Sequence, residues 1–136
     1  MMIDKYRFPN QYNTTYESPR FRKLTSPFHY IDPVEGEIIC KTGLLVDGAS
    51  FGRFFMLLFG DQHDYDIPSA PHDQLYECNI VDGRYLTRKE CDRVLYRAMM
   101  YAGFSQILAS IFYFGVRIGG WISWNRNRKL DKKSTK

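Results

Sequence analysis

The feature that most constrains the fold is an amphipathic stretch that begins at a capping box, Thr87-Arg88-Lys89-Glu90. A Thr at the N-cap and a Glu three residues later satisfy two free backbone N–H groups at the start of a helix. Apolar residues then recur three and four residues apart, which is the period of one helix face, and Gly103 is suited to end the helix. They are Cys91, Val94, Leu95, Ala98, Met99 and Ala102. A helix with such a face must pack against other parts of a folded domain.

The remainder of the chain predicts a single α+β domain. Its 136 residues fit one domain, and 44% hydrophobic residues favour a folded body over disorder. Residues 20–42 contain the strand-like runs RFRKLT, PFHYI and EIICK, with turn chemistry at Glu35-Gly36. We therefore expect a small N-terminal antiparallel hairpin or sheet, followed by three helices. Residues 1–19 are expected to form an extended arm ahead of a domain over 20–125.

Two more helices complete this prediction. One covers Ser69 to Cys78, with Ser69 as its cap and Pro71 at an early position, and the apolar run 51–60 favours a buried helical turn before it. The other runs from Gln106 to Trp124 and is apolar on nearly all sides. It is long enough to approach a membrane span, yet Arg117 near its middle disfavours spanning. A core helix, a helix lying on or in a membrane and an oligomer interface all remain open.

The positive charge lies mainly in the last residues of the chain. Residues 126–136 hold six Lys/Arg against Asp131 alone, whereas the other residues hold 13 basic and 14 acidic side chains and are close to neutral. We expect a basic tail over 126–136, either solvated or in contact with a phosphate-bearing surface. Basic residues in the body do not cluster with aromatic ones, so nucleic acid is not expected as a partner.

The cysteines and the N-terminus predict a reducing place of synthesis. Cys40, Cys78 and Cys91 are an odd number without the spacing of a zinc ribbon, so free thiols are expected. The first ten residues are polar and lack the apolar segment of a signal peptide.

The candidate site consists of the adjacent His72 and Asp73, together with Tyr76 and Asp92. On a helix, His72 and Tyr76 share one face, while Asp73 points about 100° away. Imidazole titrates near neutrality, so His72 is suited to be a general base, provided that an acceptor holds its far ring nitrogen. Asp92 can supply that acceptor if the two helices pack antiparallel, and Asp73 can then bind a divalent cation. The alternative is a buried polar network that only joins the helices.

Two further acidic groups have open interpretations. Asp47, in Asp47-Gly48-Ala49-Ser50, is either a ligand or orienting group at the His-Asp site, or an Asx-type turn. The loop with Asp61, His63, Asp64 and Asp66 is either a metal site or a solvated loop. Neither a serine-hydrolase elbow, a P-loop nor a dinucleotide fingerprint is present.

Three blocks in order carry a resemblance to a known family. They are GLLVDGAS (43–50), PHDQLY (71–76) and RKECDRVLYRAM (88–99). The chain resembles, over residues 30–124, an uncharacterised family of small phage and prophage proteins, a domain of unknown function. The resemblance implies a phage-encoded protein that is made in the host cytoplasm and has phage structural proteins or further copies of itself as partners.

The His-Asp-x-x-Tyr motif and the later Asp also resemble phospholipase A2, in its reduced bacterial and viral-capsid forms. That resemblance implies that His72 activates a water, Asp73 binds Ca²⁺, and Tyr76 and Asp92 orient the imidazole. Asp47 and the carbonyls of residues 43–50 would complete the calcium site. This loop has fewer glycines than the family's calcium loop, and the disulfides of the secreted members are not matched.

Two functional hypotheses follow. In the first, the chain is a metal-assisted hydrolase, and its apolar third helix and basic tail favour an anionic membrane surface. In the second, it is a non-catalytic virion or accessory component, and the His-Asp-Tyr-Asp set is structural.

Overall fold

A computed structural model describes residues 3–18, 21–47 and 65–134 of the chain. Within these ranges, strands β1 to β5 come first, and helices α2 to α5 follow, with a short β6–β7 hairpin between α2 and α3. The predicted α+β class is confirmed. The helical turn predicted over 51–60 lies outside the described residues, as do Asp61, His63 and Asp64.

The N-terminal half forms two small antiparallel sheets. Strands β1 (Thr14–Tyr16), β2 (Arg22–Leu24) and β5 (Leu45–Val46) make one sheet in the order β1-β2-β5. Strands β3 (Phe28–Asp32) and β4 (Gly36–Cys40) form the predicted hairpin. Part of the expected N-terminal arm thus pairs as a strand.

A second hairpin, which the sequence analysis did not predict, lies between α2 and α3. Strands β6 (Ile80–Val81) and β7 (Arg84–Tyr85) are joined by Asp82-Gly83. Both turn residues have positive φ, 50° and 76°, as a two-residue type I′ turn requires. The Asp-Gly pair is the sequence signal for this turn. The hairpin shortens the connection between α2 and α3.

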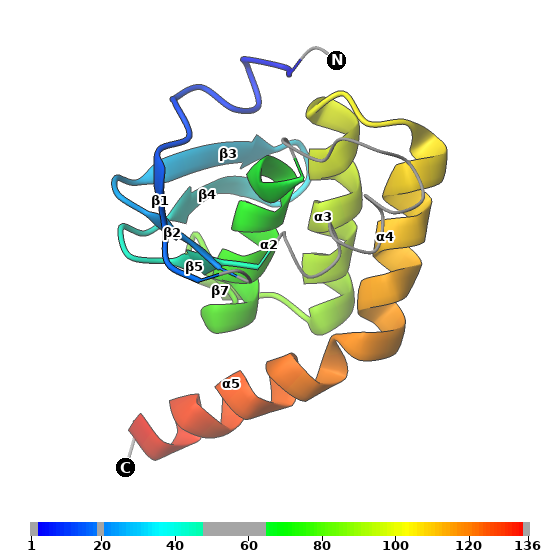
Figure 1. Cartoon of the computed structure of the whole chain (residues 1–136). Helices are drawn as coiled ribbons and strands as arrows, with labels where there is room; N and C mark the ends of the chain where they lie inside the picture. The colour runs from blue at the N-terminus through cyan, green and yellow to red at the C-terminus, as the bar shows by residue number, and fades with distance from the viewer. Residues whose placement is uncertain (1–2, 19–20, 48–64, 135–136) are drawn as a thin grey trace.

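Helices α2 (Asp66–Glu77), α3 (Arg88–Tyr101) and α4 (Gln106–Gly119) stand side by side, each antiparallel to the next, with the sheets beside α2 (Figure 1). The predicted capping box of α3 is confirmed. Thr87 Oγ1 accepts from the Glu90 N–H at 3.2 Å, and Glu90 Oε1 accepts from the Thr87 N–H at 2.9 Å.

The start of α2 differs from the prediction. The helix begins at Asp66, three residues earlier than expected, and its N-cap is Tyr65 without a side-chain cap. Ser69 Oγ instead donates back to the Tyr65 carbonyl at 2.8 Å. An acidic side chain and a proline, Asp66 and Pro68, suit the first turn and support the earlier start.

The last predicted helix and the basic tail are also corrected. The chain turns at Gly120, so 106–124 is not one helix: α4 ends at Gly119, and α5 (Trp121–Ser134) continues at an angle of 57°. Most residues of the predicted tail belong to α5, which passes below the C-terminal end of α2 (Figure 1). Adjacent glycines, Gly119-Gly120, permit such a sharp bend.

The core lies between α3 and its neighbours. All six apolar residues predicted for the inner face of α3 are buried. Tyr65 adds an aromatic stack, with its ring centroid 4.9 Å from that of Phe104 and 5.2 Å from that of Phe112. All three cysteines lie in the described ranges and are free thiols, as predicted.

A buried ion pair ties the β3–β4 hairpin to α3. Arg97 donates to both carboxylate oxygens of Asp32, with Nη2 2.9 Å from Oδ2 and Nε 3.0 Å from Oδ1. The Tyr30 hydroxyl donates to the same carboxylate at 2.8 Å, and the Glu35 N–H donates to it at 2.9 Å. A buried carboxylate with these partners orients the hairpin against the helix.

We expect Arg97→Ala to lower the free energy of unfolding by about 3 kcal/mol, because it leaves the buried Asp32 carboxylate without its cation. Arg93→Ala, an exposed arginine one turn earlier on the same helix, is the control and should change it by less than about 0.5 kcal/mol. Urea unfolding followed by circular dichroism measures both. Equal losses in the two variants would contradict the role of the ion pair.

Candidate functional site

Helices α2 and α3 bring together the three residues proposed as catalytic. His72 Nε2 lies 2.9 Å from Asp92 Oδ1, and the Tyr76 hydroxyl donates to the same oxygen at 2.5 Å. The rings of His72 and Tyr76, one turn apart on α2, lie in contact with centroids 4.2 Å apart. The expected antiparallel pairing of α2 and α3 thus places Asp92 as the acceptor for His72.

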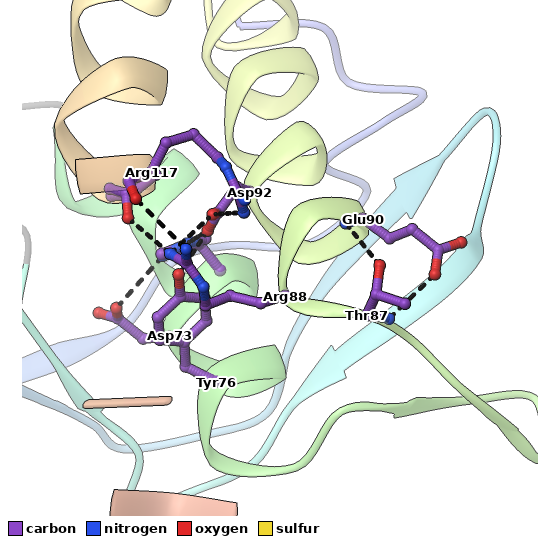
Figure 2. Close-up of polar contacts among 9 residues, drawn as sticks. Asp73, Tyr76, Thr87, Arg88, Glu90, Asp92 and Arg117 are labelled. Carbon is purple, nitrogen blue, oxygen red and sulfur yellow. Dashed lines mark hydrogen bonds and ion pairs between the residues drawn. The ribbon is translucent and has the colours of Figure 1, made fainter. Parts of the chain in front are cut away.

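Two arginines that the sequence analysis did not assign complete the surroundings of Asp92 (Figure 2). Arg117 Nη1, from α4, donates to Asp92 Oδ2 at 2.8 Å. Arg88 Nη1 lies 3.5 Å from the same oxygen and donates at 3.0 Å to the carbonyl of Val116, while its Nη2 reaches the carbonyl of Arg117. Arg88 therefore caps the C-terminal end of α4 and adds positive charge beside Asp92.

The sequence indicates that Arg117 has a counter-ion, but it does not indicate which residue that is. A single charge in the middle of an apolar helix needs a counter-ion when it lies against the protein. That requirement identifies Arg117 as a paired residue, yet the pairing with Asp92 depends on how α4 packs.

Asp92 is charged in the folded protein. Burial by itself raises the pKa of this carboxyl, but hydrogen bonds from His72, Tyr76 and Arg117 outweigh burial and hold the pKa below its usual value of 3.8. A carboxylate accepts hydrogen bonds, so the proton of the His72–Asp92 contact belongs to His72 Nε2. The other ring nitrogen, Nδ1, is then the one that can gain or lose a proton.

The pKa of His72 is raised. Burial lowers it, but Asp73 and Asp92 outweigh this effect and raise the pKa above the usual 6.5. Asp73 Oδ1 lies 3.8 Å from His72 Nδ1, too far for a hydrogen bond, so we treat this contact as an ion pair. The imidazole therefore has one nitrogen fixed by Asp92 and the other facing a second carboxylate.

A cavity of about 230 Å³ lies beside the imidazole. Asp73 and Ser69 contribute polar groups to its lining, and Leu95, Phe112 and Val116 contribute apolar ones. The cavity adjoins a larger groove of about 500 Å³ along α5, and the two share Asp47, Asp73, Tyr76 and Ser123. His72 itself is only 5% exposed, so reagents would reach it through this space.

The two proposed metal ligands lie together. The backbone N–H of Asp47 donates to Asp73 Oδ2 at 2.7 Å, so Asp47 is at the site, in contact through its main chain. Burial, together with the charge of Asp47, raises the pKa of Asp73, against the lowering effect of His72. The expected Asx turn involves residues 48–50, which lie outside the described ranges.

Asp73 and Asp47 by themselves supply fewer oxygens than a calcium ion takes. Ca²⁺ takes roughly six to eight oxygen ligands, whereas one oxygen of Asp73 already accepts a backbone hydrogen bond and the other faces His72. Across residues 3–18, 21–47 and 65–134, no group of three or more His, Cys, Asp or Glu side chains could hold a metal ion. Calcium at Asp73 and Asp47 stays a prediction, and no chemical step below is assigned to it.

Helix α5 holds the end of α2 next to the site. Asn127 Nδ2 and Arg128 Nη2 both donate to the Tyr76 carbonyl at 2.9 Å, and Arg128 Nη2 also reaches the Glu77 carbonyl at 2.8 Å. The Trp124 ring packs edge-on against Tyr76, with centroids 5.4 Å apart. These donors satisfy carbonyls that a helix leaves open at its C-terminus.

Tyr76 also makes the bend after α4 specific for glycine. A Cβ on Gly120 would lie 2.5 Å from the Tyr76 hydroxyl oxygen and 2.5 Å from the Val116 carbonyl oxygen, whereas one on Gly119 would meet nothing within 4 Å. The close approach of α5 to Tyr76 therefore depends on Gly120.

Gly120→Ala should destabilise the fold by about 1–3 kcal/mol, because the new methyl group displaces Tyr76. Gly119→Ala is the matched control and should be neutral or slightly stabilising, since it adds a helix-favouring residue in open space. Thermal unfolding of both variants measures the difference. A Gly120→Ala variant as stable as Gly119→Ala would show that Tyr76 and α5 are not packed as described.

The raised pKa of His72 predicts a pH dependence of stability. A group whose pKa is higher in the folded than in the unfolded state stabilises the fold fully below the unfolded value of about 6.5, and this contribution is lost as pH rises through the folded pKa. The free energy of unfolding of the wild type should therefore fall as the pH is raised above 6.5. In His72→Gln this loss should be absent, and a fall as steep as that of the wild type would contradict the pairing.

The chain was compared with known proteins. Searches of curated proteins and of solved structures found no match. A family model described as "Protein of unknown function (DUF1353)" matches residues 22–116, which is more than half of the chain and includes His72, Asp73, Tyr76 and Asp92. The predicted membership of a family of unknown function is thereby confirmed: the chain belongs to the DUF1353 family.

Proposed function

We propose that this protein is a hydrolase in which His72 acts as a general base toward water. The observation that carries the proposal is the His72–Asp92 pair beside a cavity: Asp92 fixes Nε2 at 2.9 Å, and the imidazole lines the cavity of about 230 Å³. A general base needs a fixed orientation, a charge partner and room for its reactant.

The chemistry follows from the two ring nitrogens. With Nε2–H donating to Asp92, neutral His72 carries a lone pair on Nδ1. This nitrogen would take a proton from a water as its oxygen attacks an acyl carbon, and it would then return the proton to the leaving group. Asp92 and Asp73 would stabilise the imidazolium formed in between. Arg117 would hold the Asp92 carboxylate in place.

The lining of the cavity favours an ester with an apolar acyl part. Leu95, Phe112 and Val116 offer an apolar wall opposite the polar groups of α2. The larger groove that continues along α5 gives room for the remainder of a substrate. Both features agree with the resemblance to phospholipase A2.

A second function is favoured by a separate observation. Asp92 has no exposed side-chain surface, and its carboxylate contacts side chains of three helices: His72, Arg88 and Arg117. Such a network can serve only to join helices. On that basis the chain would be a non-catalytic, phage-encoded virion or accessory component, with phage proteins or further copies of itself as partners.

The two candidates differ in the effect of His72 on hydrolysis. If His72 is the base, His72→Ala should lower the hydrolysis of a phospholipid or a short-chain ester by about 10²–10⁴-fold. His29→Ala, which removes a histidine of strand β3 outside the site, is the control and should keep the rate. Fluorogenic ester hydrolysis, with and without added Ca²⁺, measures both variants.

The pH profile tests Asp92 in the same assay. Because His72 must be neutral to act, the wild-type rate should rise with pH through a value above 6.5. Asp92→Asn removes a group that raises this pKa, so the rising limb should move to lower pH while the maximum rate falls. No hydrolysis by the wild type across these esters, with and without calcium, would reject the hydrolase and favour the structural role.

A further inference from the structure

Helix α4 presents an apolar stripe away from the core. Ile107, Phe114 and Ile118 are 73%, 61% and 78% exposed, and Ile111 lies between them at 38%. Their spacing of four, three and four residues places them on one helix face. The opposite face carries buried residues, such as Phe112, that pack into the domain. Contiguous exposed apolar surface of this kind marks an interaction site.

The stripe continues onto α5 and there becomes basic. Trp121 and Ile122, the first residues of α5, are both more than half exposed. Arg126, Lys129 and Lys133 follow Ile122 at intervals of four, three and four residues, so they share its helix face. The same residues, with Trp121, line one surface groove.

The inner side of α5 is used differently. Asn127 and Arg128 bind the end of α2, and Arg128 also lies over the Trp124 ring, 4.5 Å from its centroid. The contacts of α5 with α2 thus come from its inner side. The apolar-then-basic order of the exposed residues along α4 and α5 needs another explanation.

We propose that this α4–α5 face docks on an anionic lipid surface. The apolar stripe and Trp121 would enter the headgroup boundary, and the basic residues of α5 would meet lipid phosphates. Apolar side chains, a tryptophan and lysines on one face are the composition of interfacial helices. A second copy of the chain is the poorer occupant, since both sides of a symmetric contact would carry the same basic residues of α5.

Surface docking also agrees with helix length. Among the described residues, no single helix is long and apolar enough to cross a membrane, and α4 with α5 meets the length and composition only as a pair bent by 57°. Helices lying in the plane of the interface need no span of about 20 residues. The inference does not depend on the proposed hydrolase, because docking requires neither His72 nor the cavity.

Co-sedimentation with vesicles of diether phosphatidylglycerol and diether phosphatidylcholine tests the proposal. These lipids contain no acyl ester, so docking is measured separately from acyl-ester hydrolysis. We expect binding to mixed anionic vesicles, weakened by salt, and little binding to pure phosphatidylcholine. Trp121 fluorescence should shift to the blue on binding, and Trp121→Phe should remove that shift.

Three variants test which residues of the α4–α5 face bind the vesicles. Ile118→Glu should reduce partitioning through the apolar stripe. Lys129→Glu with Lys133→Glu should reduce it by about 25-fold or more, since each basic residue near an anionic surface contributes roughly fivefold. Tyr85→Glu, at an equally exposed aromatic residue on β7, is the control and should bind as the wild type.

All of these side chains are exposed, and circular dichroism verifies the folding of each variant. Failure of the wild type to bind, equal binding to both vesicle types, or binding that neither substitution reduces would overturn the proposal. So would a concentration-dependent dimer that Ile118→Glu dissociates, because it would assign the face to a second copy.

Discussion

The carboxylate of Asp92 is the group on which the helical part of the structure depends. A buried negative charge costs several kcal/mol unless donors and cations surround it. Here His72 and Tyr76 reach it from α2, Arg117 reaches it from α4, and Arg88 lies beside it on α3 itself. The three helices must therefore keep one relative placement for the charge to be compensated. The helix packing and the candidate site are products of the same requirement.

What the sequence could predict is what depends on local chemistry. The capping box at Thr87 and the buried face of α3 follow from spacing on one helix, and the structure confirms both. The contact of His72 with Asp92 was expected only if α2 and α3 pack antiparallel, which they do. The Asp82-Gly83 turn has a local signal as well, because an Asp-Gly pair favours a type I′ turn.

Features that depend on distant contacts could not be predicted in the same way. A side chain at position 120 would meet the ring and hydroxyl of Tyr76, which lies far earlier in the chain, and the pairing of Arg117 with Asp92 requires α4 to be in place. The charges of residues 126–136 suggested a tail that is either solvated or in contact with a phosphate-bearing surface. In the structure, residues 126–134 belong to α5, which is anchored through Asn127 and Arg128 to carbonyls of α2. Sequence spacing within one helix carries no information on such contacts.

Tyr76 joins two parts of the molecule that have been described separately. Its hydroxyl contacts Asp92, while its carbonyl and ring contact α5, the helix that carries the basic outer face. A displacement of α5 would therefore be transmitted to the carboxylate that orients His72. Thermodynamic linkage makes such an effect reciprocal: if occupation of the outer face of α5 changes the affinity of the cavity for a ligand, that ligand changes the affinity of the outer face by the same factor.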